Sequence, residues 1–136
     1  MKDQLYDSVV TRVAIPNASR TANSAVNGTT VDKQYNGNMF RQVMFCIFTG
    51  TITDGTVAYT MQDSPDNSAW TAVAAEFIQG TLPTTVSTDD DKVFDVGYSG
   101  YQRYVRLVAT QSGATSGGVS GAVAIMSSAR RTPVSH

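Results

Sequence analysis

Hydrophobic and polar residues alternate along much of the chain, which is the pattern of half-buried β-strands. The clearest case is the stretch 57–73, VAYTMQDSPDNSAWTAV. Every second residue from Val57 to Met61 is apolar, and the residues between them are small or polar. The segment 63–68 follows, and its Pro, Asp and Asn residues favour a tight turn. We therefore predict a β-hairpin, with a second strand that begins at Trp70, at the centre of an antiparallel domain.

The same alternation predicts the other strands. They are expected at residues 8–15, 29–31, 39–49, 93–96, 104–110 and 119–126. In the first of these, Val9, Thr11, Val13 and Ile15 share one face, and Pro16 ends the strand. The segment 39–49 is almost continuously apolar, which is typical of a central strand covered on both faces.

Two regions leave more than one interpretation open. Residues 19–37 are rich in Ser, Thr, Asn and Gly, and the turn dipeptides Asn27-Gly28 and Asn36-Gly37 lie within them. This region forms either a weak hairpin or a long surface loop. Residues 74–78 either continue the strand after Trp70 or form a single helical turn.

About eight strands without a convincing helix predict an all-β protein. Their spacing favours an antiparallel β-sandwich of the jelly-roll type, with an immunoglobulin-like sandwich as the alternative. The chain has 136 residues, which suits one domain. We expect an N-terminal arm at 1–7, the sandwich domain at 8–126 and a C-terminal tail at 127–136. Both ends are polar, so we expect them to be ordered only against a partner.

Composition excludes several classes of partner. Charged residues make up 15% of the chain and the net charge is -1, so no concentrated basic face is expected and nucleic acid is a poor partner. The most apolar run, residues 39–48, is about half the ~20 residues of a membrane helix. The first ten residues lack the apolar core of a secretory signal. We expect a protein without a membrane partner that is made in a reducing cytoplasm.

Residues with catalytic chemistry are sparse. Cys46 is the one cysteine and is expected to be a buried, inert thiol, and the one histidine, His136, is the last residue. The block Asp89-Asp90-Asp91 offers oxygen ligands for calcium, but it lacks the spacing of a dedicated loop, and a solvated turn explains it as well. Glu76 and Asp95 would form the carboxylate pair of a glycosidase only if the fold brought them together. We expect no enzyme activity, no cofactor and no metal site.

Aromatic residues are the better lead to function. Trp70 is expected to be largely buried, because a Trp that directly follows a polar hairpin tip can fold over the end of the sandwich and cover core residues there. Tyr98, Tyr101 and Tyr104 surround a glycine-flanked loop, where they serve ordinary packing, a protein interface or sugar binding. The candidate interface residues are Leu5, Tyr6, Tyr98, Tyr101, Tyr104, Arg130 and Arg131.

Two segments resemble small proteins encoded in the structural modules of tailed-phage genomes. The first pattern is carried by Gln62, Ser64, Asp66, Trp70 and Val73, and the second by Tyr104, Val105, Arg106 and Leu107. The resemblance covers roughly the last two-thirds of the chain. It implies a capsid cement, or decoration, protein with a jelly-roll-like fold.

Such a protein sits on the outer surface of an icosahedral phage head and bridges neighbouring capsomers. The implied partners are the major capsid protein and a second copy of the chain, because related jelly-roll proteins form dimers at two-fold positions. The implied location is the capsid surface of the virion, after synthesis in the host cytoplasm. A carbohydrate-binding β-sandwich module and a head–tail joining or minor tail protein are the alternatives.

Overall fold

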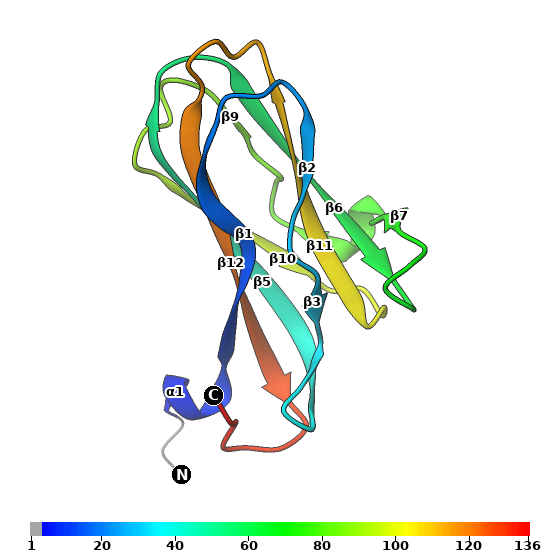
Figure 1. Ribbon diagram of the computed structural model, residues 1–136. Coiled ribbons are helices and arrows are strands. Elements are labelled where there is room, and N and C mark those ends of the chain that lie inside the picture. The colour runs from blue at the N-terminus through cyan, green and yellow to red at the C-terminus, as the bar shows by residue number, and fades with distance from the viewer. Residues whose placement is uncertain (1–3) are drawn as a thin grey trace.

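The computed structural model describes residues 4–136 and consists of two antiparallel sheets packed face to face (Figure 1). Sheet I contains, in spatial order, β1 (Val10–Arg20), β12 (Gly118–Ala129), β5 (Asn38–Ile52), β10 (Val93–Tyr98) and β8 (Ile78–Gln79), and β4 (Gln34–Tyr35) pairs with β5. Sheet II contains β2 (Ala25–Asn27), β11 (Tyr104–Ser112), β6 (Thr56–Ser64) and β7 (Thr71–Ala72), with β3 (Val31–Asp32) beside β11 and β9 (Thr84–Thr85) beside β6. The helices are α1 (Leu5–Ser8) and the single 3-10 turn η1 (Ala75–Phe77).

The main strands pair in a nested order. The first pairs with the last, β1 with β12, and then β2 with β11, β5 with β10 and β6 with β7. The chain is therefore one long antiparallel hairpin rolled into two sheets, and its tip is the β6–β7 turn. This is the strand order of a jelly roll, so the predicted fold class is confirmed and the immunoglobulin-like alternative is not adopted.

The hairpin at residues 57–73 is present, with Gln62 opposite Ala72. Its turn is held by the Asp66 carboxylate, which accepts hydrogen bonds of 2.9 Å from the backbone N–H groups of Ser68 and Ala69. Only its first strand lies inside a sheet, because β7 has two residues and forms the edge of sheet II. The prediction of a central position is therefore right for β6 and wrong for the strand after Trp70.

Strand β1 differs from its prediction. It continues past Pro16, and its register shifts between Val13 and Ile15 and again after Ile15. These bulges place Ala14 and Ile15 in the core and leave Val13 55% exposed, so the predicted common face is wrong. Pro16 is tolerated because β1 is an edge strand, where a missing N–H costs no ladder bond.

Strand β5 is central, as predicted, but it is not covered on both faces. Phe45 and Ile47 point between the sheets and are fully buried, whereas Met44, Cys46 and Phe48 on the opposite face are exposed or half-buried. The strand therefore carries an apolar surface that the rest of the described chain leaves open.

The region 19–37 forms neither a single hairpin nor a plain loop. It carries the short strands β2, β3 and β4, and only the turn at Asn36-Gly37, where both residues have positive φ, connects two paired strands. Residues 74–78 adopt the helical alternative, since η1 precedes β8.

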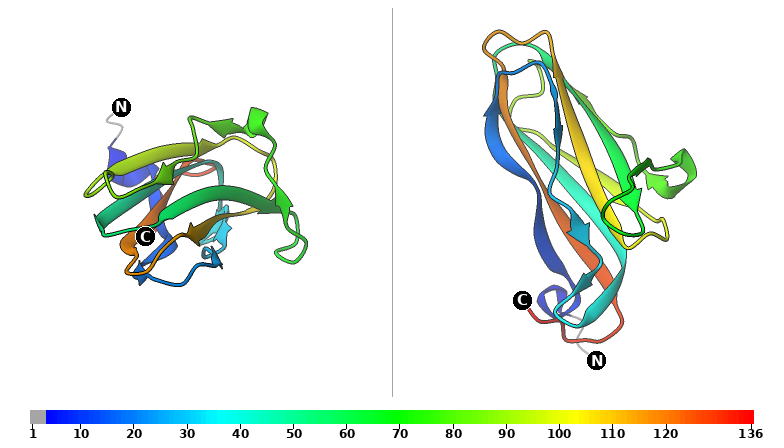
Figure 2. Two further views of the ribbon diagram at one scale, coloured as in Figure 1. Left: turned by 90° about the horizontal axis from the view of Figure 1, so that it is seen from above. Right: turned by 45° about the vertical axis from the view of Figure 1, so that its right-hand side comes forward.

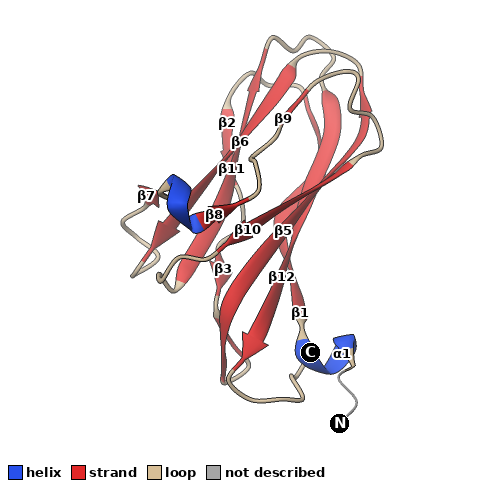
Figure 3. Cartoon of the chain, turned by 180° about the vertical axis from the view of Figure 1, so that it is seen from behind, coloured by secondary structure: helices blue, strands red, loops and turns tan. Residues whose placement is uncertain are grey.

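Helix α1, the first described element, and the C-terminal end of the chain lie together at one end of the sandwich (Figures 2 and 3). The Val134 N–H donates to the Asp7 carbonyl at 3.0 Å, and the His136 ring stacks on Tyr6 with centroids 4.1 Å apart. Val134 is buried in the core, and β12 runs to Ala129, beyond the expected end of the last strand at Met126. The predicted arm and tail thus contact each other, although residues 1–3 of the arm lie outside the described residues. No helix in 4–136 has the length and apolarity to span a membrane.

Removing a phenyl ring should lower the free energy of unfolding by different amounts on the two faces of β5. Phe45→Ala should lower the free energy of unfolding by about 3–5 kcal/mol, the usual cost in a packed core. Phe48→Ala should cost roughly half as much, because one side of that ring already contacts water. Denaturant unfolding of both variants measures the difference, and equal losses would contradict the assignment of the two faces.

Candidate protein-binding surfaces

The structure divides the seven candidate interface residues into two groups. Leu5 and Tyr6 lie in α1, and Arg130 and Arg131 directly follow β12. Helix α1 and the C-terminal end of the chain lie at the same end of the sandwich (Figure 1), and we name these four residues the terminal cluster. The three tyrosines lie on or beside the connection between β10 and β11.

The terminal cluster consists of exposed side chains on an anchored backbone. Arg130 N–H donates to the Met39 carbonyl at 2.8 Å. Asn38 binds Arg131 twice, accepting from its N–H at 3.1 Å and donating to its carbonyl at 2.7 Å. Within residues 4–136 neither arginine side chain forms an ion pair, so both guanidinium groups are available to a partner.

Tyr98 belongs to the core and not to the surface. It is 1% exposed, because the alternation of β10 turns Val96 and Tyr98 inward. Its hydroxyl donates to the Asp63 carboxylate at 2.7 Å and accepts from the Gln102 N–H at 3.2 Å. Burial and the bond to Asp63 raise the pKa of Tyr98. It therefore holds the β10–β11 connection in place and offers no contact to a partner of the folded chain.

A buried lysine supports the same connection. Lys33 donates from Nζ to the Gly100 carbonyl at 3.3 Å and lies 5.5 Å from the centroid of the Tyr98 ring. Burial lowers the pKa of Lys33, and the nearby charge of Asp63 opposes that shift. Sequence reasoning missed this residue, although its position two residues after the buried Val31 was a signal that it faces inward.

The other two tyrosines do not share one surface. Tyr101 is 87% exposed and meets Phe77 edge to face, with centroids 5.5 Å apart. Tyr104 is half-buried, and the Arg103 guanidinium lies 4.9 Å from its ring centroid. Arg103 also binds Asp32 through two bonds of 2.8 Å, which lower the pKa of that carboxyl. Only Tyr101 remains as an exposed ring in this region.

Trp70 is half-buried and does not lie between the sheets, so the expectation of a largely buried Trp is wrong. The Arg106 guanidinium lies 4.2 Å from its ring centroid. Arg106 is oriented by two bonds to the Gln62 side-chain oxygen, at 3.0 and 2.8 Å. Trp70 precedes an edge strand, so it covers the outer side of sheet II, and Val73 packs on the core in its place. Gln62 and Arg106, from the two resemblance patterns, therefore meet on adjacent strands.

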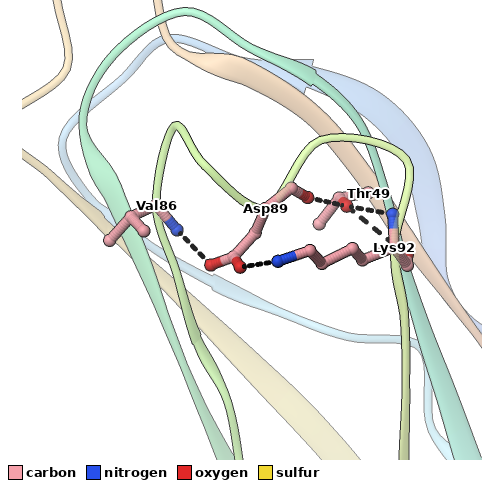
Figure 4. A network of polar contacts seen from close by, with 4 residues as sticks. All are labelled: Thr49, Val86, Asp89 and Lys92. Atoms are coloured by element: carbon pink, nitrogen blue, oxygen red, sulfur yellow. Dashed lines mark hydrogen bonds and ion pairs between the residues drawn. The ribbon is translucent and has the colours of Figure 1, made fainter.

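The acidic block stabilises its own turn (Figure 4). Asp89 accepts from the Val86 N–H at 3.0 Å and pairs with Lys92 at 2.8 Å, and both bonds lower the pKa of its carboxyl. Thr49 donates to the Asp89 carbonyl, and Asp90 accepts from the Ile52 N–H at 2.7 Å. In residues 4–136 no three acidic, His or Cys side chains are grouped to hold a metal ion. Glu76 is in η1 and Asp95 in β10, on separate elements.

Sequence reasoning missed an apolar surface on the outer side of sheet I. Cross-strand neighbours share a face of a sheet, and three rows on this side are apolar. Val13, Val123 and Cys46 form one row, Ile125 and Met44 a second, and Phe48 and Val93 a third, where the Phe48 ring lies over Gly121. We name these seven residues the apolar face. Asp95, beside Cys46, is the one charged residue within these rows.

The apolar face ends in a hollow of about 750 Å³. Met44, Ile125 and Gly97 lie in neighbouring positions across the sheet and line it, and the Gln79 side chain lies over Gly97. Leu5, from the terminal cluster, is part of its lining and is highly exposed. A protruding apolar side chain thus stands beside a largely apolar recess, whose lining also contains the polar side chains of Gln42, Gln79 and Asp95.

Comparison with known proteins agrees with the fold. No family model and no curated protein matches the chain. The solved structure of the PBSX exported protein XepA is similar with a TM-score of 0.58 and 15% identity, over 93% of this chain and 39% of XepA. The chain therefore spans about two-fifths of the length of XepA and shares the fold of that part. The SPBc2 prophage-derived protein YomS has a TM-score of 0.43 and 17% identity, over 88% of this chain and 93% of YomS.

The thiol at the centre of the apolar face should be slow to react. Burial, together with the hydrogen bond and charge of Asp95, raises the pKa of Cys46 to about 11. The thiolate is the nucleophile, so at pH 8 folded protein should react with a disulfide reagent at least tenfold more slowly than unfolded protein, and the rate should rise as the pH approaches about 11. Asp95→Asn should speed the reaction at pH 8. Equal rates for folded and unfolded protein would contradict this environment for the thiol.

Proposed function

We propose that the chain is a structural protein of a phage virion that binds the outer surface of an icosahedral head and joins neighbouring capsomers. Its partners in this role are the major capsid protein and a second copy of itself, and the role requires no catalysis. The resemblance of residues 62–73 and 104–107 to phage structural proteins supports the proposal. So does the fold shared with part of XepA, which is phage-derived.

The terminal cluster is the observation that carries the proposal. Arg130 and Arg131 are suited to charge-assisted hydrogen bonds with carboxylates on a shell protein. Leu5 and Tyr6 add exposed apolar area at the same end of the sandwich, and aromatic and arginine residues are typical anchors of protein interfaces. Since the backbone under this cluster is tied to Asn38 and Met39, binding would not have to order the C-terminal arginines from a free tail.

A second copy of the chain would allow each contact with the shell to be modest. A symmetric dimer presents two identical binding surfaces, related by the same kind of two-fold axis that an icosahedral shell contains. After one half has bound, the second binds at high effective concentration, and this raises the overall affinity by roughly 10² to 10⁴. The net charge of -1 provides little long-range attraction, so adhesion would depend on such short-range contacts.

The carbohydrate alternative receives less support from the geometry. Sugar binding needs exposed aromatic rings grouped on one surface, whereas Tyr98 is buried, Tyr104 is covered by Arg103 and Trp70 by Arg106. The other virion roles, in head–tail joining or as a minor tail protein, differ from the proposal in location. Copy number and position on the particle separate them.

Removing the two positive charges of the terminal cluster should weaken binding to heads. Arg130→Ala/Arg131→Ala should raise the Kd for heads that lack the protein at least tenfold, because two charge-assisted contacts are lost. The measurement is co-sedimentation of protein with heads over a range of concentrations, followed by cryo-electron microscopy of saturated particles.

Arg12→Ala/Lys92→Ala is the matched control, since it removes the same charge elsewhere on the fold. It should leave the Kd within about twofold of the wild-type value. An equal effect of both double variants would refute a specific role for the terminal cluster. Failure of the wild-type protein to bind heads, or density confined to the tail, would overturn the proposed function itself.

A further inference from the structure

The apolar face of sheet I is built like an interior surface. Residues 39–48 have the near-continuous apolar character of a strand that is covered on both sides, yet only one side of β5 is covered within the described chain. The neighbouring strands extend this surface, with Val13 55% and Val93 65% exposed at its two margins. Leaving so many apolar side chains in contact with water is costly, so a binding partner should cover them.

The size of the face sets the strength of that contact. Three rows about 7 Å apart, across strands spaced about 4.8 Å apart, give a footprint of about 400 Å² on sheet I. The hollow beside Leu5 extends it further. Stable interfaces bury about 800 Å² on each partner, so this face suits a reversible association in the micromolar range rather than a permanent one.

The composition of the face favours a second copy of this chain as the occupant. Homodimer interfaces are more apolar than contacts between different proteins and are depleted of charge at their centre. The one charge in these rows, Asp95, is on β10, towards one margin of the face. A two-fold axis through the middle of the face, between β12 and β5, would hold the two Asp95 carboxylates about 14 Å apart, beyond the screening length at physiological salt.

The shape of the face also favours a second copy of this chain as its partner. In a two-fold contact each copy presents one surface to itself, so that surface must contain both the protruding and the recessed element. Leu5 and the hollow beside it supply such a pair on one patch. Two sheets also pack well face to face, about 10 Å apart with their strands nearly aligned, as the two sheets within each chain already do.

We infer that two copies of the chain associate through the apolar face, with sheet I of one packed against sheet I of the other. The inference rests on the pairing of copies in the proposed function and names the surface that makes it. It uses Leu5 of the terminal cluster but leaves Tyr6, Arg130 and Arg131 outside the contact, so the two arginines proposed to bind the shell remain accessible in the dimer.

Two methionines of the same strand provide a matched test. Met44 is 38% exposed and lies in the apolar face, whereas Met39 is 39% exposed and lies beside the β10–β11 connection. Met44→Glu should raise the dimer Kd at least tenfold, because it places a charge in an apolar contact, while Met39→Glu should leave the Kd within about twofold of the wild-type value. Both positions are accessible to water, so both variants should keep the wild-type circular dichroism spectrum.

Sedimentation equilibrium from about 1 to 200 µM would measure the association, with the 14.5 kDa chain as the monomer reference. Val13→Glu, at the β1 margin of the face, is a second variant that should behave like Met44→Glu. A wild-type protein that stays monomeric throughout, or equal effects at Met44 and Met39, would overturn the inference.

Head binding separates this inference from the proposed function. If Met44→Glu loses dimerisation but the monomer still binds heads with a weakened apparent affinity, both stand. A wild-type dimer that does not bind heads refutes the proposed function and leaves the dimer surface intact. If the wild-type monomer binds heads through the apolar face, so that Met44→Glu abolishes binding without any dimer to lose, the occupant is the shell and the inference is wrong.

Discussion

The position of β12 between β1 and β5 is the constraint on which the rest of the structure depends. It joins the beginning of the chain to its longest strand, so sheet I exists as a continuous surface only because this last strand occupies its interior. The inward residues of β12 include Ala122 and Ala124, which are nearly or fully buried opposite larger side chains of β5. Small residues on one strand and Phe45 and Ile47 on its neighbour let the two sheets approach to a packed core without overfilling it.

The fold class was predictable from the sequence because period-2 alternation depends on local residues alone. It identifies most long strands, including β6, β10 and β11, and the Asn36-Gly37 turn follows from its own chemistry. The phase of β1 was not predictable. A bulge at Ala14 is set by how β1 meets β12, and no residue near Val13 signals it in the one-dimensional pattern.

The candidate site was predictable only in part, for a related reason. The exposure of the terminal cluster could be predicted because both ends of the chain are polar. The burial of Tyr98 and Trp70 instead depends on which strands lie beside them in the fold. Tyr98 points inward from β10, and its hydroxyl donates a hydrogen bond to Asp63. Trp70 precedes an edge strand, and its ring stacks against the Arg106 guanidinium. The sequence could not show that the apolar face is exposed. The residue pattern indicates how apolar a strand is, but not whether the layer that covers it comes from the same chain.

The nested pairing of strands has a consequence for how the protein is made. Since β1 pairs with β12, more than ninety residues must leave the ribosome after β1 before its partner exists. Until then β5 also lacks one neighbour and exposes apolar edges on a nascent chain whose contacts are almost all long-range in sequence. Folding should therefore begin only after translation of residues 118–129, and it should be slow on the scale of small domains. Chaperones that hold extended apolar segments, and low synthesis temperatures, would then determine the yield of soluble protein more than the stability of the finished fold does.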